Sequence, residues 1–120
     1  MTPTMRAAVL EGPQRFSVAD VPVPTPAPGE VLIRLEGCGV CASNLEPWAG
    51  LDWMTYPGDA GGLGHEGWGV IDAVGADVRD LAPGDRVAAL SYKSFAEADI
   101  AKAVLMPGDP LRAQFVGEHY

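Results

Sequence analysis

The sequence predicts a mainly β domain, either a barrel or a sandwich of short strands. Glycine and proline together number 26 of the 120 residues (15 glycines and 11 prolines), and they are spread along the chain instead of forming a repeat. Short apolar or alternating stretches recur between these turn formers, and hardly any segment shows helical periodicity. Short strands separated by turns are typical of barrels and sandwiches.

The first part of the chain is expected to contain three strands. Residues 5–11 form an apolar run that ends at a glycine-proline turn, and residues 16–21 alternate in polarity. A proline at every second position from 22 to 28 favours an extended connector. Residues 31–36 predict a half-buried strand, because they are rich in β-branched and aliphatic side chains and then alternate.

One short helix is expected after the third strand. Residues 42–48 favour a helix that Ser43 or Asn44 could cap, and a proline and a glycine nearby limit it to one or two turns. Residues 51–63 then form a long loop, and a loop of this length in a compact domain is more often functional than accidental.

The remaining strands are expected to be short. Residues 67–74 predict a strand whose glycines mark a bulge or a close backbone approach. Residues 78–81 and 86–90 flank a turn and predict a hairpin-type pair. Two further strands are expected at about 95–100 and 103–106.

Length and charge limit the function. We expect one β domain over residues 1–110, whereas residues 111–120 show no pattern and form a tail or the start of another segment. A formal net charge of −8 argues against a nucleic acid or an anionic membrane as partner, because phosphate binding needs a basic face. No apolar run is long enough to cross a membrane and no leader peptide is evident, so a cytoplasmic location is the expectation.

The strongest chemical signal is Cys41 with His65, at the two ends of the segments that flank the long loop. A thiolate with an imidazole selects zinc among the common metals, and Glu66 could be a third ligand or a partner of one. A core cysteine and a structural histidine account for the same spacing, so both interpretations stay open at this point.

Three other patterns carry less weight. Gly62-x-Gly64-x-x-Gly67 matches a dinucleotide fingerprint by letter, but it leads into a strand and not a helix. Cys38-x-x-Cys41 lacks the β-α-β context of a redox pair, so Cys38 is interpreted as a small buried residue. Four aromatic residues could wall an apolar cleft or simply pack the barrel: Trp48, Trp53, Tyr56 and Trp68.

The segment Gly64-His65-Glu66-x-x-Gly69, followed by Gly75 and Val78, resembles the zinc-binding signature of zinc-containing alcohol dehydrogenases. The resemblance extends over roughly residues 5 to 107. Three other stretches are similar to the same family: Met5-Arg6-Ala7-Ala8-Val9, Gly39-Val40-Cys41-Ala42-Ser43 and Pro83-Gly84-Asp85-Arg86-Val87.

This resemblance implies a GroES-like, partly open β-barrel with one short helix after Cys41 and long loops. It further implies that Cys41 and His65 bind a catalytic zinc ion, that Glu66 lies in its first or second shell, and that Ser43 relays a proton from the alcohol substrate. Zinc supplies Lewis-acid chemistry to such a reaction.

The chain departs from the family in several places. The family usually has an Asp that supports the metal shell where this chain has Asn44, which changes the charge around the metal. No cysteine follows Cys41, so the four-cysteine structural zinc lobe is absent and one catalytic zinc is the most the chain can hold. The family's second cysteine ligand, and its Rossmann domain for NAD or NADP, would lie in further polypeptide.

The first hypothesis is therefore the zinc-binding catalytic portion of an NAD(P)-dependent alcohol or polyol oxidoreductase, silent without its Rossmann domain or chain. Its substrates would be small alcohols, polyols or aldehydes. An alternative is a stand-alone zinc- or partner-binding module without enzymatic activity. A third possibility is a purely structural barrel that assembles into rings and ignores zinc.

Overall fold

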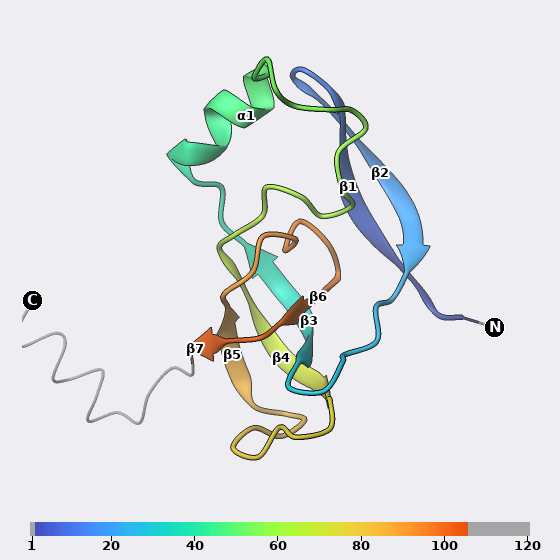
Figure 1. Cartoon of the computed structure of the whole chain (residues 1–120), viewed down its shortest axis with the longest axis vertical. Helices are drawn as coiled ribbons and strands as arrows, with labels where there is room; N and C mark the ends of the chain where they lie inside the picture. Colours follow the sequence, from blue (N-terminus) through green and yellow to red (C-terminus); the bar gives the residue numbers. More distant parts are fainter. Residues whose placement is uncertain (1, 106–120) are drawn as a thin grey trace, which may run out of the picture.

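The computed structural model describes residues 2–105, which form a mainly β domain with one short helical segment (Figure 1). Every strand pair in it is antiparallel. The elements in chain order are strands β1 (Thr4–Gly12), β2 (Arg15–Pro22) and β3 (Val31–Cys38), the 3-10 turn η1 (Ala42–Asn44), helix α1 (Leu45–Ala49), and strands β4 (Gly67–Val74), β5 (Arg86–Ala89), β6 (Ala98–Ala101) and β7 (Val104–Leu105).

The strands form two sheets that are joined along one seam. The hairpin β1-β2 is one sheet, and the other has the strand order β6-β3-β4-β5-β7. Residues 95–97 join them: the Ala8 amide donates to the Phe95 carbonyl at 2.8 Å, and the amides of Glu97 and Leu35 extend the connection to β1 and β3. The combined surface curls into a partly open barrel, as the resemblance implied.

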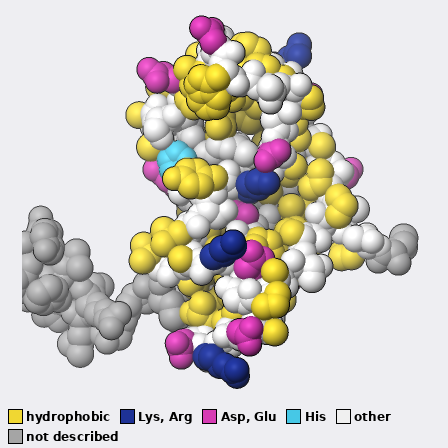
Figure 2. Space-filling view, in the orientation of Figure 1, with side chains coloured by type: hydrophobic (Ala, Val, Ile, Leu, Met, Phe, Trp, Pro, Cys, Tyr) yellow, Lys and Arg dark blue, Asp and Glu magenta, His cyan; other side chains and the backbone are white. Residues whose placement is uncertain are grey.

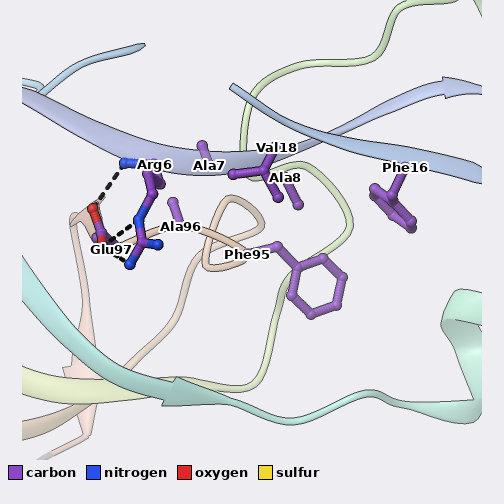
Figure 3. Close-up of a pocket in the computed structure, with 8 residues that line it drawn as sticks. All are labelled: Arg6, Ala7, Ala8, Phe16, Val18, Phe95, Ala96 and Glu97. Carbon is purple, nitrogen blue, oxygen red and sulfur yellow. Dashed lines mark hydrogen bonds and ion pairs between the residues drawn. The ribbon is translucent and has the colours of Figure 1, made fainter. Parts of the chain in front are cut away.

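A charged pair reinforces this seam. The Glu97 carboxylate accepts hydrogen bonds from the backbone amide of Arg6 at 2.8 Å and from two nitrogens of its guanidinium at 3.0 and 2.7 Å (Figure 3). Oε1 accepts both guanidinium bonds and Oε2 accepts the amide bond, so the carboxylate ties the hairpin to the strand that follows residue 97. Beside this pair lies an apolar cavity of about 490 Å³, which is lined by Phe16, Val18 and Phe95 among others.

The core is built from side chains of the five-stranded sheet. Ile33 on β3 and Ile71 on β4 are register partners and are 0% and 1% exposed. Around them pack the other buried members of this core: Val31, Val87, Ala89 and Ala101. Burial of these aliphatic side chains is the main term that stabilises the domain.

Gly69 of β4 marks a register shift and a close backbone approach, as the sequence predicted for the glycines of this strand. The β3-β4 register shifts twice, and Gly69 lies next to the second shift. A side chain at Gly69 would collide with the backbone carbonyl of Arg34 on the neighbouring strand. Only a residue without a Cβ allows the two strands to approach this closely.

The predicted hairpin of residues 78–81 with 86–90 is wrong. β5 pairs with β4 and β7 instead, and residues 78–81 form no strand. The reason is that the intervening turn bonds to β4: the Gly84 amide donates to the Ile71 carbonyl at 2.8 Å, and the Ile71 amide donates to the Asp85 carbonyl at 2.9 Å. The apolar residues before that turn pack against the core without pairing.

The other boundaries differ less. The strand expected at 95–100 begins only at Ala98, because residues 95–97 bridge two neighbours instead of running along one. The last strand within the described residues, expected at about 103–106, is Val104–Leu105. Residues 106–120, which include the expected domain boundary at 110, lie outside the described residues.

Two observations bear on partners. Figure 2 shows basic side chains scattered singly among acidic and apolar ones on the face drawn, in line with the net charge of −8. Within residues 2–105, no helix has the length and apolar character that crossing a membrane requires.

Candidate metal centre

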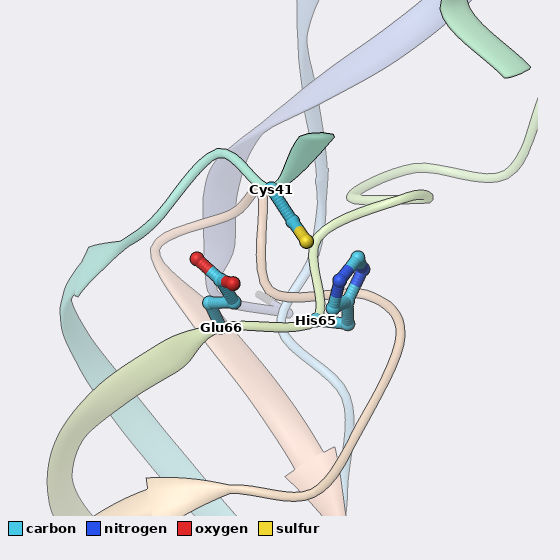
Figure 4. Close-up of side chains that lie close together, drawn as sticks. All are labelled: Cys41, His65 and Glu66. Atoms are coloured by element: carbon cyan, nitrogen blue, oxygen red, sulfur yellow. The ribbon is translucent and has the colours of Figure 1, made fainter. Parts of the chain in front are cut away.

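Strand pairing brings the predicted ligand residues together. The last residue of β3, Cys38, is the register partner of the first residue of β4, Gly67. Residues just after β3 therefore lie beside residues just before β4, and the ligand atoms of Cys41, His65 and Glu66 all lie within 4.8 Å of one another (Figure 4). Small side-chain rotations would bring such atoms to about 2.0–2.3 Å from a shared ion.

The glycines around the cluster allow its loops to approach closely. A side chain at Gly39 would collide with the Glu66 carboxylate, and one at Gly64 would meet the backbone of Ser94 and Phe95. Gly67 is the first residue of a strand and not of a helix. These glycines serve chain packing, so the dinucleotide-like letter pattern has no phosphate-binding geometry.

The His65 ring is held at both nitrogens. Its Nδ1 lies 3.1 Å from the backbone carbonyl oxygen of Leu63, and its Nε2 lies 3.3 Å from Ser43 Oγ. A carbonyl can only accept, so Nδ1 carries the hydrogen and donates. In the neutral ring, Nε2 is then the bare nitrogen, which accepts from the Ser43 hydroxyl and is free to bind a metal.

The residues of the cluster also shift the pKa values of Cys41 and His65. Hydrogen bonding with Ser43, and then with His65 in its protonated form, lowers the pKa of the Cys41 thiol. The same contact with Cys41, with lesser help from the Leu63 carbonyl, raises the pKa of His65. A thiol with a lowered pKa is more often the thiolate, which is the form that binds metals.

The donor set suits zinc. A thiolate, an imidazole nitrogen and a carboxylate oxygen are all ligands that zinc uses in proteins. The half-buried imidazole and thiol face each other, and the exposed carboxylate of Glu66 completes the group. The residues present therefore fit a zinc ion.

Asn44, at the position where the resembled family has an Asp that supports the metal shell, contacts the loops of both Cys41 and His65. It was expected as a possible helix cap, and its side chain closes a capping box with Cys41 at η1, although it makes no cap hydrogen bond to α1. Its Oδ1 accepts from the Cys41 amide at 2.9 Å and its Nδ2 donates to the Leu63 carbonyl at 2.7 Å. The sequence signal for this position was the amide in place of the family's usual carboxylate.

Tyr92 was also missed. Its ring lies beside that of His65, with centroids 5.9 Å apart and planes at 47°. It belongs to the segment that follows β5, 27 positions from His65 in the sequence, so no local pattern linked the two residues.

Cys38 stands apart from the cluster. It is half-buried, its thiol lies 3.4 Å from the Gly39 carbonyl, and burial raises its pKa. A thiol with a raised pKa is a poor redox nucleophile, in line with the interpretation of Cys38 as a packing residue.

The predicted aromatic cleft does not form as a single feature. Trp48 lines an apolar cavity of about 250 Å³ together with Phe16 and Leu45. Trp68 packs over Gly37 and lines a different cavity of about 280 Å³. Trp53 is 77% exposed. The four aromatic residues therefore do not share one wall.

Comparison with known proteins identifies a matching family model and several relatives of this chain. The model of the alcohol dehydrogenase GroES-like domain family matches residues 27–107. The alcohol dehydrogenase of Rhizobium meliloti (strain 1021) is 45% identical over 85 residues, which cover 70% of this chain and 25% of that protein. The sorbitol dehydrogenase of Ovis aries is 39% identical over 80 residues, covering 67% and 23%.

Solved structures agree with the fold. A short chain alcohol dehydrogenase from Escherichia coli CFT073, complexed with the cofactor NADH, is similar with a TM-score of 0.73 and 25% identity over 89% of this chain and 39% of that chain. The chain thus spans about a quarter of the length of the curated relatives it matches.

Proposed function

The chain belongs to the alcohol dehydrogenase GroES-like domain family, and on that premise we propose that it is the zinc-binding catalytic portion of an NAD(P)-dependent alcohol or polyol oxidoreductase. The observation that carries the proposal is the convergence of Cys41, His65 and Glu66, with Ser43 hydrogen-bonded to the histidine. Small alcohols, polyols or aldehydes are the proposed substrates.

Cys41 and His65 are the proposed principal ligands, through Sγ and Nε2. Glu66 is the proposed third contact, directly or through another ligand. A bound zinc ion would supply Lewis-acid polarisation of the substrate oxygen. One ion is proposed, at this cluster.

Ser43 is the proposed proton relay. Its Oγ lies 3.3 Å from His65 Nε2, so the hydroxyl lies beside a proposed ligand atom. A hydroxyl can accept one proton while it donates its own, so Ser43 can take a proton from a substrate hydroxyl and pass it to water.

Hydride transfer needs a nicotinamide cofactor, which the proposal assigns to a Rossmann-type domain or chain outside these 120 residues. The NADH-bound structural relative supports this division, because this chain covers only 39% of it.

A cytoplasmic location is part of the proposal, since a reducing compartment keeps a cysteine ligand as the free thiol.

The metal proposal is tested by titrating the reduced, metal-free chain with Co²⁺ as a spectroscopic substitute for zinc. We expect one equivalent to bind and to give a sulfur-to-cobalt charge-transfer band. Cys41→Ala should abolish that band and His65→Ala should abolish or greatly weaken binding, whereas Cys38→Ala, which removes the other thiol, should change neither. A band that depends on Cys38 instead of Cys41 would contradict the assignment.

The enzymatic proposal needs a second experiment. In a chimera, this chain replaces the matching 85 residues of the Rhizobium meliloti relative. We expect the chimera to reduce NAD with an alcohol, and Ser43→Ala to lower kcat by about 10²–10⁴-fold with zinc retained. The isolated chain should be inactive, and turnover by it would refute the need for another domain. An inactive chimera that binds zinc would favour the stand-alone module.

A further inference from the structure

We propose that the open edge of β2 pairs with the same edge of a second copy of this chain, so that two chains form a symmetric dimer. The inference goes beyond the proposed enzymatic function and does not depend on the metal cluster. It rests on the backbone groups of β2, on two exposed apolar side chains beside them, and on how both meet across a two-fold axis.

The outer edge of β2 is open. On the side away from β2, strand β1 is covered by residues 58–61 and 95–97, whose backbones hydrogen-bond to it. Among the described residues, 2–105, no strand pairs with the other side of β2, which lies at the right-hand margin of the strands in Figure 1. The hairpin sheet therefore has one free edge, and a free edge is a template for pairing with another chain.

The register of the hairpin shows which backbone groups face this edge. In an antiparallel pair, a residue that bonds away from the partner strand lies opposite a residue that does the same. Residues 6, 8 and 10 of β1 bond away from β2, to residues 58–61 and 95–97. Their register partners therefore direct their amides and carbonyls to the open edge: Asp20, Val18 and Phe16.

Two of these residues also expose apolar side chains. Val18 is 72% and Phe16 is 41% exposed, and both lie on the side of Phe95 in Figure 3, whereas Ala7 points away from it. Together with Phe95 they line the apolar cavity of about 490 Å³. The central stretch of β2, residues 16–19, has none of the charges or prolines that usually protect a strand edge from association.

A second copy fits this edge best in one register. Outward groups must meet outward groups, so Phe16 lies opposite an even-numbered residue of the other copy. Opposite Asp20, its ring would face a carboxylate. Opposite another Phe16, it would leave Val18 against Gln14. Phe16 opposite Val18 makes two identical apolar pairs, each of which exchanges two backbone hydrogen bonds, with Ser17 opposite Ser17 on the axis.

The same register brings opposite charges together. The Ser17 hydroxyl donates to the Glu11 carboxylate at 2.6 Å, so this carboxylate lies close to the proposed axis. Arg15 of the second copy stands diagonally across from Ser17, at a spacing of about 7–8 Å that its long side chain can span to reach Glu11. The two-fold axis makes this contact twice. The edge is therefore complementary to itself in hydrogen bonding, apolar surface and charge.

Symmetry also limits the size of the assembly. Each copy uses its one free hairpin edge, so the pairing closes at two chains and does not continue into a fibre. The paired region is short, and we therefore expect a dimer that forms at high protein concentration and dissociates on dilution.

Sedimentation equilibrium of the reduced chain over a range of concentrations gives the first test. We expect the mass to rise from that of one chain to that of two. Val18→Lys places a charge on the edge and should abolish the rise. Leu105→Lys, the same change at an exposed apolar side chain on β7, should not. A mass that stays at one chain throughout, or an equal effect of both lysines, would overturn the proposal.

A backbone variant separates strand pairing from simple apolar contact. Val18→Pro removes the one amide that faces the open edge and spares the hydrogen bonds between β1 and β2. We expect it to keep the circular dichroism spectrum of the unmodified chain and to lose the dimer. A folded Val18→Pro chain that still dimerises would refute pairing through this edge.

Disulfide trapping tests the register. In a Cys38→Ala, Cys41→Ala background, Ser17→Cys should form a disulfide-linked dimer with oxidised glutathione, because Cα atoms in such a pair lie about 4.5 Å apart. Ala19→Cys is the control, since it lies opposite Arg15 and too far from its own symmetry mate. A linked dimer from Ala19→Cys but not from Ser17→Cys would refute the register. A reversible dimer without any Ser17→Cys linkage would show that the copies meet through another surface.

Discussion

Ser43 Oγ lies 3.3 Å from His65 Nε2, although 22 positions separate the two residues in the chain. The contact exists because the end of β3 and the start of β4 are register partners, which places the turns beyond them side by side. It joins the proposed proton relay to a proposed metal ligand.

Ser43 also hydrogen-bonds Cys41, and this second contact predicts how the metal-free thiol titrates. Hydrogen bonding by Ser43 is the largest cause that lowers the pKa of Cys41. Ser43→Ala should therefore raise that pKa, so that thiolate appears at higher pH, whereas Ser43→Thr keeps the hydroxyl and should change it little. Alkylation rates measured against pH in a Cys38→Ala background, where Cys41 is the only thiol, check the direction. An unchanged profile in Ser43→Ala would contradict the assigned cause.

The seam between the hairpin and the main sheet should lose stability in acid. Hydrogen bonds from Arg6 hold the pKa of Glu97 below its ordinary value. A carboxyl with a lowered folded-state pKa adds stability above its unfolded pKa, and that contribution disappears as pH falls through the folded value. The difference in unfolding free energy between the unmodified chain and Glu97→Gln should thus shrink from neutral toward acidic pH.

Urea unfolding of a double-mutant cycle with Arg6→Gln measures this effect. Both side chains are exposed, so the coupling should be small and should weaken further in high salt. A coupling that grows in acid would show that some other group is responsible.

The core centred on β3 predicts the largest stability effect. Ile33 is fully buried against Ile71, so Ile33→Val should cost about 0.5–1.5 kcal/mol and Ile33→Ala about 2–5 kcal/mol of unfolding free energy. Val18→Ala, at a side chain that is 72% exposed, should stay within about 0.5 kcal/mol. Equal losses at the two positions in urea titrations would place the core elsewhere.

The close approach of β3 and β4 predicts a steric effect. Gly69→Ala would push a methyl group into the Arg34 carbonyl and should cost about 1–3 kcal/mol or more. Gly58→Ala is the matched control, because a methyl group there meets only ordinary contacts at 3.6 Å or more and its φ is not positive. Thermal unfolding of both variants compares them, and the control should differ little from the unmodified chain.

The fold was largely predictable because its signals are local. The alternation of residues 16–21 and the aliphatic run at 31–36 depend only on near neighbours, and both proved to be strands. The hairpin predicted for 78–81 failed because long-range hydrogen bonds from the turn to Ile71 decide its pairing. Adjacent strand-like segments need not pair with each other when a central strand offers a better partner.

By itself, the sequence determined the strand content, the short helix after Cys41 and the choice of Cys41, His65 and Glu66 as candidate ligands, because residue chemistry and spacing carry that information. Only the tertiary structure decided that these side chains meet, which nitrogen of His65 is bare, and that Asn44 donates a hydrogen bond to the Leu63 carbonyl. Those features depend on the register of β3 against β4, which is not written in any local pattern.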